Sequence, residues 1–90
     1  MASVTVTLPR LLADLVDSDR RVPVDATDVE GALDAACHRH PQLRVHVFDG
    51  SGGLRPHVTC LMDGVVVRDA LDRPLADGDE VVVLQAVSGG

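Results

Sequence analysis

The sequence predicts a single α+β domain, in which a sheet of four to five strands packs on one main helix. Three observations indicate this fold class: an alternating strand near the N-terminus, one amphipathic helix with clear start and stop signals, and several strand-like segments in the second half. Strand, strand, helix and then three strands is the order expected where a helix covers one face of a sheet. Ninety residues suffice for one such domain.

The first strand is predicted over residues 3–8, where apolar and polar residues alternate. A period of two is typical of a strand with one buried face. Residues 11–16 fit either one helical turn or a packed loop. Residues 21–25 resume a short strand, in which Pro23 favours an edge position because proline cannot donate a ladder hydrogen bond.

The main helix is predicted to begin at a capping box formed by Thr27 and Glu30, in which each side chain accepts from the other residue's backbone amide. Residues at three- and four-residue steps then share one face, namely Val29, Ala32, Leu33, Ala36, Cys37 and His40. Pro41 ends the helix, because the residue before a proline avoids the helical conformation. Such a helix needs a sheet to cover its apolar face.

The second half contains the remaining strands. Residues 43–48 fit either a turn of helix or a strand fragment, and residues 49–53 have the composition of a flexible loop. Two strand-like segments, 57–62 and 65–67, flank Asp63-Gly64, which is a strong hairpin signal.

The last strand is predicted over residues 80–87, a nearly continuous apolar run rich in β-branched residues. Such a run is typical of a central strand buried on both faces, and this strand can pair with the first one in the middle of the sheet. Residues 77–80, Asp-Gly-Asp-Glu, precede it and favour a turn over a cation site.

Charge and composition exclude several functions. The net charge of −6 repels a nucleic acid backbone, and Phe48, the single aromatic residue, offers no stacking platform for bases. No apolar run approaches the roughly 20 residues of a membrane span. No signal peptide is visible, so we expect a cytoplasmic protein that binds neither nucleic acid nor membrane.

Potential metal ligands are scattered. Cys37 and Cys60 fit no metal or redox spacing, and we expect two reduced, buried thiols. The four histidines lack zinc-site spacing and are expected to be solvated or partly packed: His38, His40, His46 and His57. We therefore expect no metal site.

The C-terminal residues carry the candidate chemistry. Only Ser88, Gly89 and Gly90 follow the last predicted strand, and two glycines there add nothing to a core. A terminal glycine pair alone is a weak signal, because chain ends are often glycine-rich. Glycine lacks a Cβ and can thread a narrow channel, and residues from Val87 onward reach roughly 13–14 Å when extended. We expect a domain over residues 1–87 and a flexible tail over 88–90.

Two segments resemble the ubiquitin-like sulfur carriers of the MoaD/ThiS family: residues 77–81 (Asp-Gly-Asp-Glu-Val) and residues 86–90 (Ala-Val-Ser-Gly-Gly). The resemblance covers essentially the whole chain and implies the β-grasp fold, with a mixed sheet. Residues 41–57 have the length found in the cysteine-synthesis and molybdopterin-type carriers. The third strand departs from many relatives, which carry a Val-Asn motif before the hairpin, whereas this chain reads Thr59-Cys60-Leu61-Met62.

The resemblance also implies a mechanism. A ubiquitin-activating-enzyme-like adenylyltransferase would use ATP to adenylate Gly90, and sulfur would then replace AMP to give a thiocarboxylate. A sulfur-accepting biosynthetic enzyme would receive that sulfur. In this reading Gly89 provides clearance, and Val87 and Ser88 set the exit of the tail. The chain itself would be a monomeric carrier rather than an enzyme, with no bound cofactor.

Two other functions share this fold. One is a passive β-grasp module that binds a partner through its sheet, and the other is a ubiquitin-like modifier that joins Gly90 to a lysine amine. The final acceptor stays open among cofactor, cysteine and other sulfur-containing products.

Overall fold

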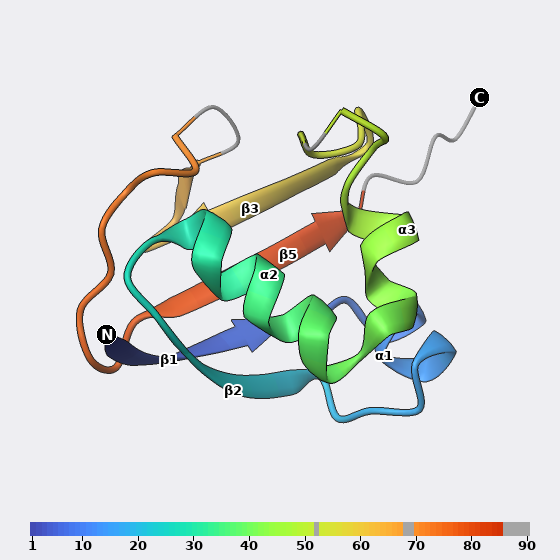
Figure 1. The fold of residues 1–90 in the computed structure, drawn as a ribbon, viewed down its shortest axis with the longest axis horizontal. Helices are drawn as coiled ribbons and strands as arrows, with labels where there is room; N and C mark the ends of the chain where they lie inside the picture. The colour runs from blue at the N-terminus through green and yellow to red at the C-terminus, as the bar shows by residue number, and fades with distance from the viewer. Residues whose placement is uncertain (52, 68–69, 86–90) are drawn as a thin grey trace.

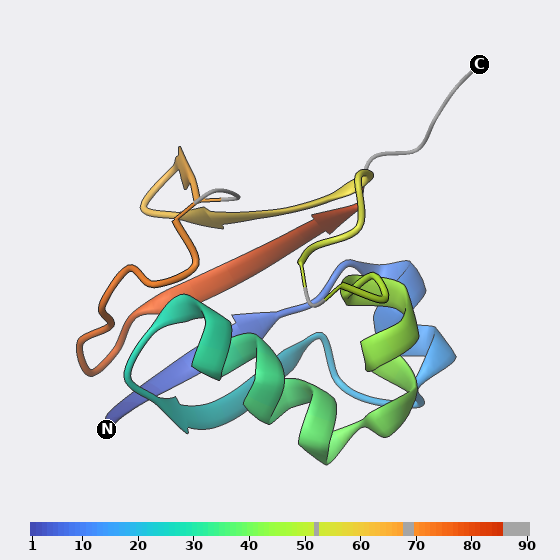
Figure 2. The ribbon, with the colours of Figure 1, turned by 45° about the horizontal axis from the view of Figure 1, so that its top comes forward.

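The computed structural model describes residues 1–51, 53–67 and 70–85. Within them five strands form one mixed sheet, and the longest helix lies across one face of it (Figures 1 and 2). The strands are β1 (Ala2–Thr7), β2 (Arg21–Ala26), β3 (Val58–Met62), β4 (Val65–Val66) and β5 (Glu80–Gln85). The helices are α1 (Arg10–Leu15), α2 (Val29–Arg39), the 3-10 turn η1 (Pro41–Leu43) and α3 (Arg44–Val47). The predicted α+β class is confirmed.

The sheet order is β2-β1-β5-β3-β4, so the last strand is central. It pairs with β1 in parallel and with β3 in antiparallel orientation, and the outer strands β2 and β4 are both antiparallel to their neighbours. Figure 1 shows β5 between β1 and β3. The expected pairing of the first and last strands in the middle of the sheet is confirmed.

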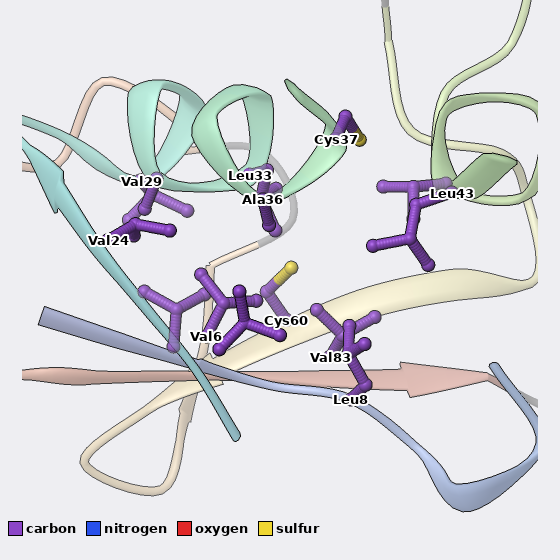
Figure 3. Close-up of a cluster of buried hydrophobic side chains, with 14 of the residues drawn as sticks. Val6, Leu8, Val24, Val29, Leu33, Ala36, Cys37, Leu43, Cys60 and Val83 are labelled. Carbon is purple, nitrogen blue, oxygen red and sulfur yellow. The ribbon is translucent and has the colours of Figure 1, made fainter. Parts of the chain in front are cut away.

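The core is an aliphatic layer between the sheet and α2. Val6 of β1, Val83 of β5 and Leu33 of α2 are at most 2% exposed, and Figure 3 shows them within one cluster. Phe48 lies at the margin with 7% of its surface exposed. None of the described polar or charged residues is fully buried. The fold therefore rests on the burial of apolar surface, which favours folding by about 25 cal/mol per Å².

The start of α2 corrects one prediction. The N-cap is Asp28, whose Oδ1 accepts a hydrogen bond from the Gly31 amide at 2.7 Å, and the helix begins at Val29. Thr27 and Glu30 form no capping box, because the connection before β5 takes the Glu30 amide, from which the Thr27 hydroxyl would have to accept. The Thr27 carbonyl accepts from Leu75 at 3.0 Å, and the Glu30 amide donates to the Leu71 carbonyl at 2.8 Å. Tertiary hydrogen bonds thus replace the local motif.

The predicted buried face of α2 is confirmed for all its members except His40, which is half-buried at the C-cap. Pro41 begins the 3-10 turn directly after that cap, as its effect on the preceding residue predicts. The two undecided segments are both helical: residues 10–15 form α1, and residues 41–47 form the 3-10 turn followed by α3.

The hairpin signal at Asp63-Gly64 and the edge-strand signal at Pro23 are both confirmed. Asp63 and Gly64 have φ values of 52° and 77°, the left-handed conformation that a type I′ hairpin turn requires at both positions. Pro23 lies on the edge strand β2, where its carbonyl accepts from Arg39 at 2.7 Å on the side away from β1.

The prediction that the last strand is buried on both faces is wrong. Val81 and Val83 are buried under α2, whereas Val82 is half-buried and Leu84 is 40% exposed. The reason is the layering in Figure 2, in which α2 covers one face of the sheet and the described segments leave the other face open. An apolar run can thus belong to a central strand with one open face.

Candidate functional site

The candidate site is the end of β5, where the chain leaves the middle of the sheet. Gln85, the last residue of the strand, pairs with Val58 of β3. The residues assigned to the carrier chemistry follow within five positions: Val87, Ser88, Gly89 and Gly90. These four, and with them the predicted boundary between domain and tail, lie outside the described residues. The structure therefore defines the strand that precedes them, β5, which is called the base below.

The base is held in register from both sides. Thr7 of β1 is opposite Val82, and Leu61 of β3 is opposite the same residue. Val81 and Val83 are at most 1% exposed and anchor the strand to the core. A slip of one residue would turn both valines to the open face, so the pattern of side chains fixes the register of β5 against its neighbours.

The turn before β5 fixes where the strand begins. The Asp77 Oδ1 accepts from the Ser3 amide at 2.8 Å, and Gly78 donates to the Ser3 carbonyl at 2.9 Å with a φ of 89°. The Asp79 Oδ2 accepts from the Ala76 amide at 2.8 Å. The predicted turn is confirmed, and its acidic side chains bind backbone amides of β1 and of the turn itself.

An apolar strip crosses the open face of the sheet, from Leu84 next to the strand end toward the β3–β4 turn at the other end. We define it as four residues of β3, β4 and β5: Leu61, Val66, Val82 and Leu84. Leu61 is opposite both Val66 and Val82, so the strip crosses three neighbouring strands. Val66 is 61% exposed and Leu84 is 40% exposed. Sequence reasoning missed this strip because it placed β5 inside two layers, although the polar half of residues 3–8 already indicated an open face.

The potential metal ligands stay apart. His38 lies beside Asp34, with its Nδ1 2.9 Å from the Asp34 carbonyl, and the His40 Nε2 lies 3.0 Å from the Ser18 Oγ. No three histidine, cysteine or acidic side chains gather as a metal site would require within residues 1–51, 53–67 and 70–85.

The two thiols are free and buried, as predicted. Burial raises the pKa of the Cys37 thiol, and the positive charge of Arg44 offsets part of this rise. The Arg44 guanidinium donates to Asp34 at 2.5 Å, which raises its own pKa, and it lies 5.6 Å from the centre of the Phe48 ring. These contacts tie α3 to α2 and serve the fold.

None of the described helices is both long and apolar enough to cross a bilayer. Two open hollows lie on the described surface, one lined by residues of α2 and α3 and the other by the loop that follows α1 and by the start of β2.

Comparison with known proteins decides the family. The profile of the ThiS family matches residues 6–90, which is nearly the whole chain. The chain belongs to the ThiS family. The match extends through the glycine pair, so the family pattern includes the residues assigned to the site. The resemblance to the ubiquitin-like sulfur carriers of the MoaD/ThiS family is confirmed. No curated protein sequence matches the chain significantly.

Solved structures agree with this family and confirm the β-grasp fold. Small archaeal modifier protein 1 from Haloferax volcanii is 37% identical over 99% of this chain and 100% of its own, with a TM-score of 0.87. A crystal structure of the BexX/CysO complex of Amycolatopsis orientalis contains a chain that is 25% identical over 97% of this one and 99% of its own, with a TM-score of 0.83. CysO from Mycobacterium tuberculosis is 25% identical over 93% and 99% of the two chains, with a TM-score of 0.81.

Proposed function

We propose that this ThiS-family chain is a sulfur carrier whose Gly90 carboxylate is adenylated by a partner enzyme and converted to a thiocarboxylate. One observation carries the proposal: the family profile runs through Gly89 and Gly90, which follow a central strand fixed in register on both sides. The carrier provides a rigid base and a terminal acid. The catalytic groups belong to the partners, and the chain binds no cofactor of its own.

The chemistry needs ATP because a carboxylate is a poor electrophile. Attack of the Gly90 carboxylate on the α-phosphate of ATP forms an acyl adenylate and releases pyrophosphate. Hydrosulfide, or a persulfide followed by reduction, then attacks the acyl carbon and releases AMP, which leaves the thiocarboxylate. That sulfur is a nucleophile toward the electrophilic substrate of a second enzyme, a biosynthetic enzyme that accepts sulfur.

The residues before Gly90 suit entry into a narrow channel. Five residues follow Gln85, and an extended chain covers at most about 3.6 Å per residue, so Gly90 reaches no more than about 18 Å from the strand end. Gly89 has no Cβ to obstruct the channel, and Val87 and Ser88 connect it to the strand. A partner must therefore seat its active site close to the sheet.

We assign the apolar strip to this contact. Leu84 directly precedes the strand end and is 40% exposed, so a protein that takes the terminus meets Leu84 first and the rest of the strip farther across the sheet. The net charge of −6 favours a partner with a positively charged channel. The crystal structure titled for the BexX/CysO complex of Amycolatopsis orientalis supports the expectation of a protein partner for this fold.

Intact mass spectrometry tests the proposal. The chain is incubated with the cognate adenylyltransferase, ATP and sulfide, and the expected product is heavier by the exchange of one oxygen for sulfur. A variant that lacks Gly89 and Gly90 is the matched control and stays unmodified. A wild-type chain that remains unmodified and releases no pyrophosphate contradicts the proposal.

Protein modification is the second candidate, because small archaeal modifier protein 1 is the 37% identical relative described above. In that case the Gly90 acyl group joins a lysine amine of a target protein and forms an isopeptide bond. The two functions share adenylation and differ in product, a thiocarboxylate or a branched adduct. Deletion of Gly89 and Gly90 abolishes both, whereas a passive binding module would keep its affinity for a partner.

A further inference from the structure

The cationic side chains of this chain have one chemical property in common. All eight basic residues of the sequence are arginine. A guanidinium stays protonated at physiological pH and has no free electron pair to attack an acyl group, whereas a lysine amine is a competent nucleophile. The arginine side chains therefore cannot capture an acyl adenylate, and the α-amine is left as the one amine that the test below has to block.

The sulfur side chains are withheld from solvent as well. Cys37 is 2% exposed and Cys60 is 0% exposed, and Figure 3 shows both in the apolar layer. The thiolate is the reactive form of cysteine, and burial disfavours it. For Cys37 the raised pKa is in line with this effect. Neither thiol can reach an activated carboxylate while the domain is folded.

We propose that this surface, arginine in place of lysine and both thiols inside the core, keeps the activated terminus from acylating side-chain amines or thiols of its own chain or of a second copy. The inference rests on the proposed function and adds a rule of specificity to it: the side-chain amines and thiols that receive the acyl group are supplied by partners. In the reaction that is prevented, an amine attacks the acyl carbon of the Gly90 adenylate, an amide forms, and AMP and a proton leave. In the modifier alternative, the same rule means that a target lysine carries a single copy of this chain. A copy that is already attached has no lysine to which a further copy could be joined.

Two arginines test the rule because they lie at opposite ends of the sheet. Arg10 is exposed at the first residue of α1, three residues after Thr7. β1 runs parallel to β5, so Arg10 lies at the end where β5 leaves the sheet, as Figure 1 shows for α1. Arg73 lies at the other end, where its carbonyl accepts from the first amide of α2 and its guanidinium is 3.8 Å from Asp63 in the β3–β4 turn.

The experiment introduces one amine at a time without a change of charge. Arg10→Lys, Arg73→Lys and the wild type, each acetylated at the α-amine, are incubated with the adenylyltransferase and ATP but without sulfide. A short covalent tether gives effective concentrations of order millimolar, against about 10 µM for a second copy in the assay, so Arg10→Lys is expected to react on the order of 100-fold faster within one chain than between chains.

The expected products are distinct. Arg10→Lys yields a chain that has lost one water, with peptide mapping placing an amide between residue 10 and Gly90. Arg73→Lys yields mainly amide-linked dimers, and the wild type yields neither product. Arg10→Gln removes the charge without adding an amine and is expected to match the wild type.

The outcomes separate the two proposals. Pyrophosphate release by the wild type shows that activation occurs, and its failure overturns the proposed function itself. If activation occurs and both lysine variants stay free of adducts, the arginine surface has no protective role and this inference is wrong. Side-chain adducts in the activated wild type would also overturn it.

Discussion

Leu84 offers a sharp test of the apolar strip, because it is partly buried in the free chain and available to a partner. Full burial of a leucine side chain is worth about 1.5–3 kcal/mol. With 40% of the residue exposed, a partner that covers Leu84 gains about 0.6–1.2 kcal/mol from it. At 1.4 kcal/mol per tenfold, Leu84→Ser is expected to raise the KM for the carrier in adenylation by about 3- to 7-fold. The kcat should stay unchanged, because the side chain does not touch the reacting atoms.

The assay is pyrophosphate release by the adenylyltransferase as a function of carrier concentration, at a temperature where both variants are folded. Leu15→Ser is the matched control: Leu15 is 52% exposed on α1, outside the strip. It should change the KM by less than about twofold, in keeping with the small effects of surface substitutions. An unchanged KM for Leu84→Ser, or an equal rise for Leu15→Ser, refutes the assignment of the strip.

Three further predictions concern the fold that holds the site. Asp28→Ala removes the observed helix cap and is expected to lower the free energy of unfolding, measured by urea denaturation, by about 1 kcal/mol. Thr27→Ala should lower it by less, and a larger loss for Thr27→Ala would indicate that the capping box forms after all. Val81→Ala removes two methyl groups buried between the central strand and α2 and should lower the free energy of unfolding by about 2 kcal/mol. Val66→Ala on the exposed strip should lower it by less than about 0.5 kcal/mol. Equal losses would contradict a sheet with one buried and one open face. The Cys37 thiol should react with a water-soluble disulfide reagent only as fast as the domain opens. The rate of this reaction should therefore rise with denaturant in step with unfolding. Rapid reaction in native buffer would show that the thiol is accessible in the folded domain.

Much of the fold follows from short-range signals. The alternation in β1, the Asp63-Gly64 turn and the proline that ends α2 each depend on backbone chemistry within a few residues, and all three agree with the structure. The central place of β5 could also be predicted, because an apolar β-branched run belongs in the middle of a sheet.

The incorrect predictions concern places where contacts with distant segments of the chain determine the local structure. Thr27 and Glu30 have the sequence of a capping box, but the Glu30 amide donates to the Leu71 carbonyl, and Asp28 takes over the cap. The open face of β5 depends on which layers cover the sheet, and an apolar run does not encode the number of layers. Residues 11–16 and 43–48 are too short for periodicity to separate helix from the alternatives, and packing against the core makes them helical.

The candidate site divides in the same way. The glycine pair could be recognised from the sequence, and the family match includes it. The apolar strip could not be recognised, because Leu61, Val66 and Val82 come from three strands and lie opposite one another only through the register of the sheet.

The most direct measurement of the central claim is the fate of isotopically labelled sulfide. After reaction with the adenylyltransferase and ATP, proteolysis at arginine releases the peptide that follows Arg68, because the bond between Arg73 and Pro74 resists cleavage, and tandem mass spectrometry locates the label within it. We expect one labelled sulfur on the carbonyl carbon of Gly90 and none on Cys37 or Cys60. Label on either cysteine, or a peptide that ends in an unlabelled carboxylate after AMP has been formed, would contradict the account.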